Sequence, residues 1–338
     1  MTPNSLRAAG LDSLLKQSTL PQNVKAAITG AFPSRESAER IMGNVVFLIR
    51  LLGAELELGG VESITIADEY HQAIASVDRG FKPPALTATN DPFGAAHAVA
   101  IPVLREGALK TCIVLRSDMA WALDDSNHEL YSRSLHLLAH ESAHAHDNEV
   151  RRRSFPEIGT RSRRDWKEEN LYKIADKCWV EYIASRLSAR WGIRTYCSEL
   201  EQPLCETLSM AMERAVESIH GYRFHRNATL VEDEIRNSFG KILVRSSYLV
   251  GHVHGLGRTV SEMASQYHKL IQETAWFLPI FERYETNLKE MYGSFGGWSG
   301  REVFSLLIDT CEALLNAGGM QYIKQSTGDY SMKLGFGS

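Results

Sequence analysis

The chain has 338 residues, of which 44% are hydrophobic and 23% charged. This composition excludes a chain that is disordered throughout, a collagen-like repeat and a coiled-coil rod, and the absence of an apolar run of about 18 residues argues against a membrane-spanning helix. The net charge of -4 gives no overall attraction to nucleic acid or to a membrane surface, so neither is expected as a partner. Scattered cysteines without a CxxC pair, and an N-terminus without a signal-peptide pattern, predict a cytoplasmic protein.

Apolar periodicity predicts many helices and a few strands. The expected elements, in chain order, are a helical segment over residues 1–54, a strand at 63–66, a helix at 68–77, a hairpin of strands at 96–104 and 110–116 around Glu106-Gly107, a long helix from a capping box at Ser126 to just before Pro156, a second helix at 165–190, helices near 203–219, 230–250, 258–290 and 300–317, and a loose tail at 328–338.

The most informative segment is H-E-x-x-H, from His140 to His144, on the long predicted helix. The i, i+4 spacing places both imidazoles on one helix face about one turn apart, where they can bind one ion. Zinc accepts neutral imidazole nitrogen, so Zn2+ is the expected cofactor. Glu141 is placed to take a proton from a water that the metal activates and to pass it to a leaving amine. The alternative is a histidine pair in the core beside a surface Glu.

Two histidines leave a zinc site short of a ligand, and the best candidate for the third is Glu181 in the segment W-V-E-Y-I-A of the second helix. A Glu within an apolar stretch needs a reason to be there, because buried carboxylates are usually paired or bind a metal. The alternative is a salt bridge from Glu181 to Arg186 or Arg190.

HESAH, followed by a helix that carries E-x-x-A from Glu181 to Ala184, resembles the gluzincin branch of the zincin metallopeptidases. The chain is most similar to the ImmA/IrrE-type metallopeptidases of bacteria and their mobile elements. The resemblance implies His140, His144 and Glu181 as zinc ligands and Glu141 as the general base.

The fold expected on this basis is a mostly helical α+β fold, in which a zincin-like catalytic core with a small antiparallel sheet precedes a helical C-terminal half. The expected domains are an N-terminal helical segment over 1–54, the metallopeptidase core over 55–195, and a helical region over 196–338 packed on the core.

Further polar residues lie near the motif. His136 and Asp147 share the helix face of the two ligands, and they are candidates for substrate contact and for holding a ligand imidazole, respectively. The alternative for each is a solvated or hydrogen-bonded side chain, and His146 is expected at the surface. The Arg-rich segment 151–164 is interpreted as a solvated loop rather than the border of a substrate site. An oxyanion donor is expected from the C-terminal part, where the candidates are His220, Tyr222, His225, Tyr248, His252 and His254.

The sequence therefore predicts a zinc-dependent endopeptidase that hydrolyses peptide bonds of a cytoplasmic protein substrate. The alternative is a zinc-binding regulatory or protein-interaction module of a stress, toxin or phage-defence system, with little or no proteolytic activity and a regulatory protein partner. Glu141 favours the enzyme, because a structural zinc has no use for a base.

Overall fold

The computed structural model describes residues 11–81, 97–155, 165–193 and 195–336. The chain forms two compact units. Unit 1 comprises residues 1–158 and 187–193, and unit 2 comprises residues 159–186 and 194–338.

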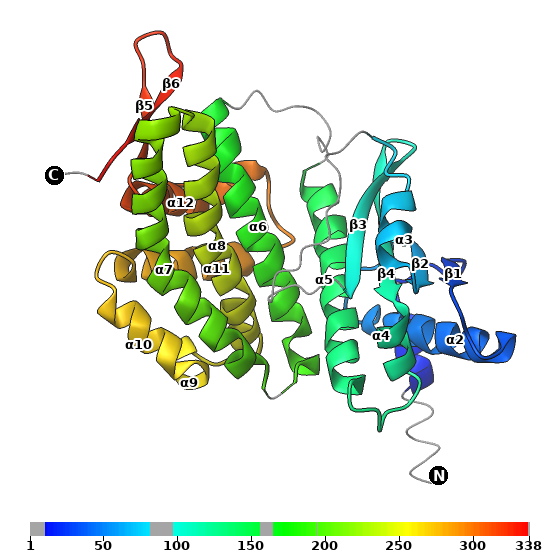
Figure 1. Ribbon diagram of the computed structural model, residues 1–338. Helices are drawn as coiled ribbons and strands as arrows, with labels where there is room; N and C mark the ends of the chain where they lie inside the picture. The colour runs from blue at the N-terminus through cyan, green and yellow to red at the C-terminus, as the bar shows by residue number, and fades with distance from the viewer. Residues whose placement is uncertain (1–10, 82–96, 156–164, 194, 337–338) are drawn as a thin grey trace. The chain divides into compact units, whose positions relative to one another are not determined.

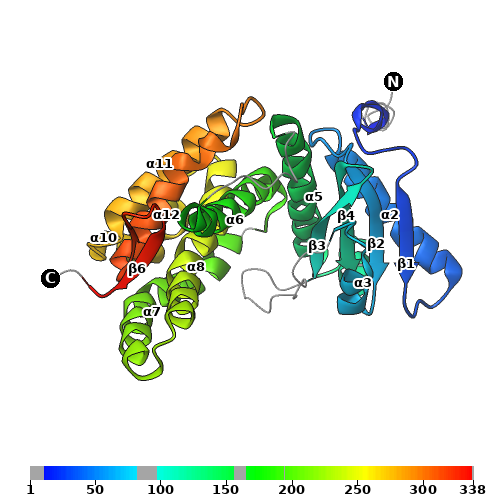
Figure 2. The same ribbon diagram turned by 90° about the horizontal axis from the view of Figure 1, so that it is seen from above.

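Unit 1 is built around a four-stranded sheet with the strand order β1-β2-β4-β3 (Figure 2). β1 and β2 pair in parallel, as do β2 and β4, whereas β3 and β4 form an antiparallel hairpin. The elements of this unit are β1 (Lys25–Thr29), α2 (Arg35–Leu52), β2 (Val61–Ala67), α3 (Tyr70–Ser76), β3 (Ala98–Arg105), β4 (Ala108–Arg116), α4 (Ser117–Ala122), α5 (Tyr131–Ser154) and the 3-10 turn η1 (Ala189–Trp191).

Alternating side chains of the sheet enter two separate cores. Ile113 and Leu115 of β4 join the larger core, which α2 and α5 cover. Cys112 and Val114 point to the opposite face, where they pack with Tyr70 of α3 and its neighbours. The period-2 alternation of the strand thus buries both faces, and α5 lies along the β3–β4 hairpin (Figure 1).

Unit 2 is a helical bundle that ends in a two-stranded antiparallel sheet (Figure 1). Its elements are α6 (Trp166–Ser188, of which the last two residues belong to unit 1), α7 (Tyr196–His225), α8 (Ala228–Gly255), α9 (Val260–Met263), α10 (Ser265–Glu273), α11 (Leu278–Gly293), the 3-10 turn η2 (Arg301–Phe304), α12 (Ser305–Ala317), β5 (Met320–Lys324) and β6 (Tyr330–Leu334).

Helix α8 packs closely on α6, and small residues make this approach feasible. A Cβ atom added at Gly251 of α8 would lie 2.3 Å from the carbonyl oxygen of Tyr182 and 2.9 Å from Cβ of Ser185. About one turn earlier along α8, Ser246 and Ser247 form hydrogen bonds with the buried hydroxyls of Tyr267 and Tyr284, respectively. The bundle thus buries large aromatic rings with their polar atoms satisfied.

The mostly helical α+β class is confirmed, and the hairpin forms where it was expected, with positive φ angles at Glu106 and Gly107. Four local predictions were wrong. The helix expected near 258–290 is divided into α9, α10 and α11. The N-terminal segment contains strand β1, and the tail contains strand β6. Helix α5 begins at Tyr131 and not at the Ser126 capping box. The predicted boundaries at 54/55 and 195/196 stay predictions.

The close approach of α6 and α8 makes a testable difference between two helical glycines. Gly251→Ala should lower the free energy of unfolding by about 1–3 kcal/mol, because backbone atoms of α6 must move away. Gly43→Ala on the exposed side of α2, where an added Cβ meets nothing within 4 Å, should raise it by up to about 1 kcal/mol. Urea unfolding of both variants measures this, and equal effects would contradict the α6–α8 contact.

Candidate metal centre

Helix α5 brings the two predicted ligand histidines together. His140 and His144 follow each other by one turn, and their ring centroids are 4.7 Å apart. One ligand atom each from His140, Glu141 and His144 lies within 4.8 Å of the others. His140 and Glu141 are buried and His144 is half-buried. The H-E-x-x-H spacing therefore produces the cluster that the sequence predicts.

The carboxylate of Glu141 is held by the sheet. Its Oε2 accepts a hydrogen bond of 2.6 Å from the backbone N–H of Ala100 in β3. Among the described residues, β3 is the last strand of the sheet, and no strand among them pairs with its outward N–H groups. A hydrogen bond to an ionised acceptor is among the stronger neutral–charged contacts in proteins, and it fixes this carboxylate beside the two imidazoles.

Tyr70 is a neighbour of Glu141 that sequence reasoning missed. The side chain lies at the start of α3 and is 2% exposed. Burial raises the pKa of its hydroxyl, and the negative charge of Glu141 raises it further. No local pattern could reveal this proximity, because residues 70 and 141 meet only through the folded sheet.

His136 and Asp147, the other polar residues of the stripe, are buried. The His136 ring centroid lies 6.4 Å from that of His140. Burial, with a smaller effect from His140, lowers the pKa of His136 to about 4, so its imidazole is neutral at pH 7. Asp147 forms an ion pair of 3.5 Å with Arg151. Their roles toward substrate and ligand stay predictions.

Arginines in the last turn of α5 form ion pairs with carboxylates. Arg152 pairs with Glu149, and Arg153 pairs with Glu57. The expected surface position of His146 is wrong, because its half-buried ring accepts a hydrogen bond of 2.8 Å from the backbone N–H of Glu57. The solvated-loop interpretation thus fails for the arginines on α5, whereas Arg161, Arg163 and Arg164 lie outside the described residues.

Glu181, the predicted third ligand, lies in α6 and belongs to unit 2. Its negative charge contributes to raising the pKa of Tyr196, after the larger effect of burial. The two arginines proposed as alternative partners are engaged elsewhere, since Arg186 donates to the Tyr182 hydroxyl and Arg190 pairs with Glu55. Glu181 as a metal ligand stays a prediction.

The candidate oxyanion donors are distributed over α7 and α8 of unit 2. The ring of His252 lies 4.7 Å from that of Tyr196, centroid to centroid, which places it in the surroundings of Glu181. Tyr222 and His225 form a ring pair near the end of α7, and His220 is exposed nearby. Tyr248 is half-buried in α8. Sequence reasoning left these candidates equal, and their roles stay predictions.

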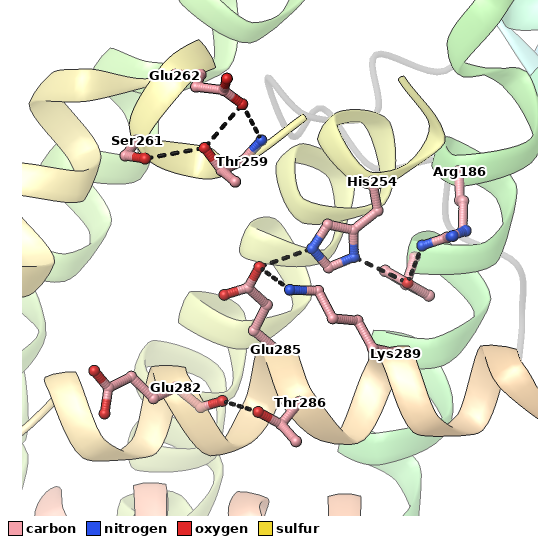
Figure 3. Close-up of polar contacts among 10 residues, drawn as sticks. Arg186, His254, Thr259, Ser261, Glu262, Glu282, Glu285, Thr286 and Lys289 are labelled. Atoms are coloured by element: carbon pink, nitrogen blue, oxygen red, sulfur yellow. Dashed lines mark hydrogen bonds and ion pairs between the residues drawn. The ribbon is translucent and has the colours of Figure 1, made fainter. Parts of the chain in front are cut away.

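His254, the sixth candidate, occupies the middle of a polar chain (Figure 3). Its Nε2 lies 2.8 Å from Oε1 of Glu285, and its Nδ1 lies 3.0 Å from the hydroxyl of Tyr182. Lys289 donates to Glu285, and Arg186 donates to the Tyr182 hydroxyl. These bonds engage both ring nitrogens of His254 within the bundle, which gives this residue a structural role.

The chemistry of the donor set on α5 fits a divalent metal. Two imidazoles within 4.8 Å of each other and of a carboxylate offer the nitrogen and oxygen atoms that zinc prefers. No protein-family model matches the chain, and neither the curated proteins nor the solved structures include a significant match. Within the described ranges, no helix is both long and apolar enough to span a membrane.

The polar chain predicts a pH effect on stability. Hydrogen bonding from His254 is the main cause that lowers the pKa of Glu285 to about 2, against the effect of burial, and Lys289 adds to it. Because this pKa is depressed from its ordinary 4.5, the stabilisation is complete above about pH 4.5 and is lost as the pH falls toward 2. Glu285→Gln should therefore destabilise the protein at neutral pH and flatten the loss of stability in this window.

Denaturant midpoints measured from neutral pH to pH 2 test this expectation. Glu282→Gln is the matched control, since Glu282 is an exposed residue on the same helix, and it should keep the wild-type slope. The same slope in Glu285→Gln as in wild type would contradict the assigned ion pair.

Proposed function

We propose that the protein is a zinc-dependent endopeptidase that hydrolyses peptide bonds of a cytoplasmic protein substrate. The observation that carries the proposal is the geometry on α5. His140, Glu141 and His144 bring their ligand atoms within 4.8 Å of one another, and a backbone N–H of the outer strand holds the carboxylate between them. A base kept beside two imidazole ligands supports hydrolysis over a purely structural metal site.

Each residue of the cluster has a defined task in this proposal. His140 and His144 would hold zinc through neutral imidazole nitrogens, and Glu181 is retained from the sequence as the third ligand. When bound, zinc would polarise the scissile carbonyl and activate a water molecule. Glu141 would accept the proton of that water on a carboxylate oxygen and deliver it to the leaving nitrogen, so that the C–N bond breaks and water is added across it.

Strand β3 supports a peptide as the substrate class. It is the outer strand of the sheet, and an extended peptide can add to such an edge through main-chain hydrogen bonds. The base is bonded to this same edge at Ala100. A peptide that pairs there would therefore have its backbone beside Glu141.

The cysteines support the proposed compartment. All five are free, and four of them are buried. Burial raises the pKa of Cys197 to about 11, which keeps this thiol protonated and unreactive at neutral pH. Free, buried thiols are typical of proteins from a reducing cytoplasm.

Removal of a ligand and removal of the base should have different effects. His140→Ala should reduce bound zinc from about one ion per chain to near zero. Glu141→Gln should keep the zinc and lower casein cleavage by at least about 100-fold, because the proton acceptor is lost. Metal analysis of the purified proteins and a casein assay measure both effects.

The exposed His71 on α3 provides the control, and His71→Ala should resemble wild type in both assays. Full zinc content in His140→Ala would refute the metal site. Zinc binding without any cleavage by wild type would instead favour the alternative of a regulatory or protein-interaction module.

The third ligand has its own test. Glu181→Gln should weaken zinc binding by at least about tenfold, since even residues outside the ligand shell change affinity by 10–100-fold. Competition with a chromogenic chelator measures the affinity. Glu169→Gln, at an exposed position on the same helix, should leave it unchanged. Equal affinities for both variants would remove Glu181 from the ligand set.

A further inference from the structure

The outer edge of β3 is occupied along part of its length. In an antiparallel strand, alternate residues turn their N–H and C=O groups to the same side. Ala100 and Leu104 donate outward, to Glu141 and to the carbonyl oxygen of Arg79, respectively. The backbone groups of Ala98 and Pro102 therefore point to the same outer side as those of Ala100 and Leu104. An added peptide would form its main-chain hydrogen bonds along this row of groups.

Residues 78–81, which we call the strap, cover the far end of this row. The carbonyl oxygen of Arg79 accepts from Leu104 N–H at 2.8 Å, and its Nε donates to the Pro102 carbonyl at 3.2 Å. Arg105 Nη2 donates to the carbonyl of Asp78 at 2.7 Å, and Arg105 Nη1 donates to that of Leu104 at 3.0 Å. Pro102 has no N–H. The outward carbonyl of Pro102 and the outward N–H and carbonyl of Leu104 are therefore all hydrogen-bonded to Arg79 or Arg105.

Gly80 allows the strap to lie against the strand. Its φ is +69°, and a Cβ atom there would lie 2.2 Å from the carbonyl oxygen of Leu104. Only glycine combines this backbone conformation with so close an approach. The N–H of Gly80 is bonded to the Asp78 carboxylate at 2.8 Å, which closes the strap on itself. The strap is thus a built part of unit 1 and not an incidental loop contact.

We infer that the strap is a stop at one end of the substrate-binding edge, so that the protein acts on peptide segments that end or turn away close to the cleaved bond. The inference rests on the proposed function. Glu141 marks the reacting position at Ala100, and Pro102 is the first residue of β3 beyond Ala100 whose outward group is bonded to the strap. At roughly 3.3 Å per residue, this leaves room for about two substrate residues on the strap side. On the other side the edge continues toward Ala98. Arg79 and Gly80 therefore determine specificity without touching the reacting atoms.

Cleavage mapping by mass spectrometry tests the inference on a pool of random decapeptides. Wild type should cut these linear peptides within about two residues of one end, the same end throughout, and should cut inside a longer chain such as casein only where the chain turns away from the edge close to the cleaved bond. A Gly-Ser tail at that end should lower cleavage by at least about tenfold because it collides with the strap, whereas a tail at the other end should have little effect. Equal cleavage of both tailed pools by wild type would overturn the inference.

Gly80→Ala displaces the strap and should restore cleavage of the pool with the blocked tail. Arg79→Ala, which loses the bond to Pro102 and the stacking of the guanidinium on the Phe81 ring but keeps the main-chain bond to Leu104, should restore it partly. Gly107→Ala is the matched control. Its φ is +79°, and an added Cβ meets nothing within 4 Å, so that it introduces the same backbone strain in the hairpin without moving the strap. A failure of Gly80→Ala to accept the blocked tail would also overturn the inference.

Residue-resolved amide exchange gives a readout that does not need cleavage. In Glu141→Gln, the decapeptide pool should slow exchange at Ala98 and leave Leu104 unchanged, because its N–H is already bonded to Arg79. In the double variant with Gly80→Ala, the Leu104 amide should exchange faster than in Glu141→Gln when no peptide is present. Adding the tailed peptide pool should then slow its exchange. Protection of neither amide would overturn the inference. Protection with this end dependence, but without cleavage by wild type, would uphold the strap and refute the proposed hydrolase.

Discussion

The hydrogen bond between Ala100 N–H and Glu141 joins the two elements on which the candidate site depends. Helix α5 alone fixes the spacing of His140 and His144, but it does not fix where the carboxylate between them points. The 2.6 Å bond to the outer strand does so. The donor is a backbone group, which neither titrates nor changes rotamer. The position of the proposed base is therefore set by the register of β3 on β4, and the sheet becomes part of the site.

This constraint explains why α5 combines a polar stripe with small apolar residues. Leu138, Ala139 and Ala145 are buried in the larger core of unit 1, and the two alanines allow the helix axis to come close to the sheet. A bulkier residue at Ala139 would push α5 outward. The distance between Glu141 and the outer strand would then grow, although no ligand had changed. Packing and chemistry are thus linked through one helix-to-sheet distance.

The parts of the structure that the sequence predicts are those encoded in local patterns. The H-E-x-x-H spacing, the β3–β4 hairpin and helix α6 each carry their own periodicity or turn residues. β1 was missed because none of its residues is buried, and it is held by backbone pairing with β2. The contacts of Glu141 with Ala100, and of Arg79 with Leu104, involve main-chain atoms, which every residue carries. No side-chain pattern in the sequence predicts these contacts. The hydrogen bond that holds Glu141 and the position of the strap can therefore be seen only in the folded structure.

The backbone anchor also determines what a substitution at position 141 can reveal. A glutamine has a side-chain oxygen of the same reach, and this oxygen can still accept from Ala100 N–H, so the tie between α5 and β3 is preserved while the proton acceptor is lost. An alanine would remove both, and it would leave the N–H of an edge strand without its partner. A difference in stability between the two variants would then measure the contribution of the hydrogen bond to Ala100. A loss of hydrolysis in both variants would measure the contribution of proton transfer by Glu141. Geometry and proton transfer at Glu141 are separable because the donor belongs to the main chain.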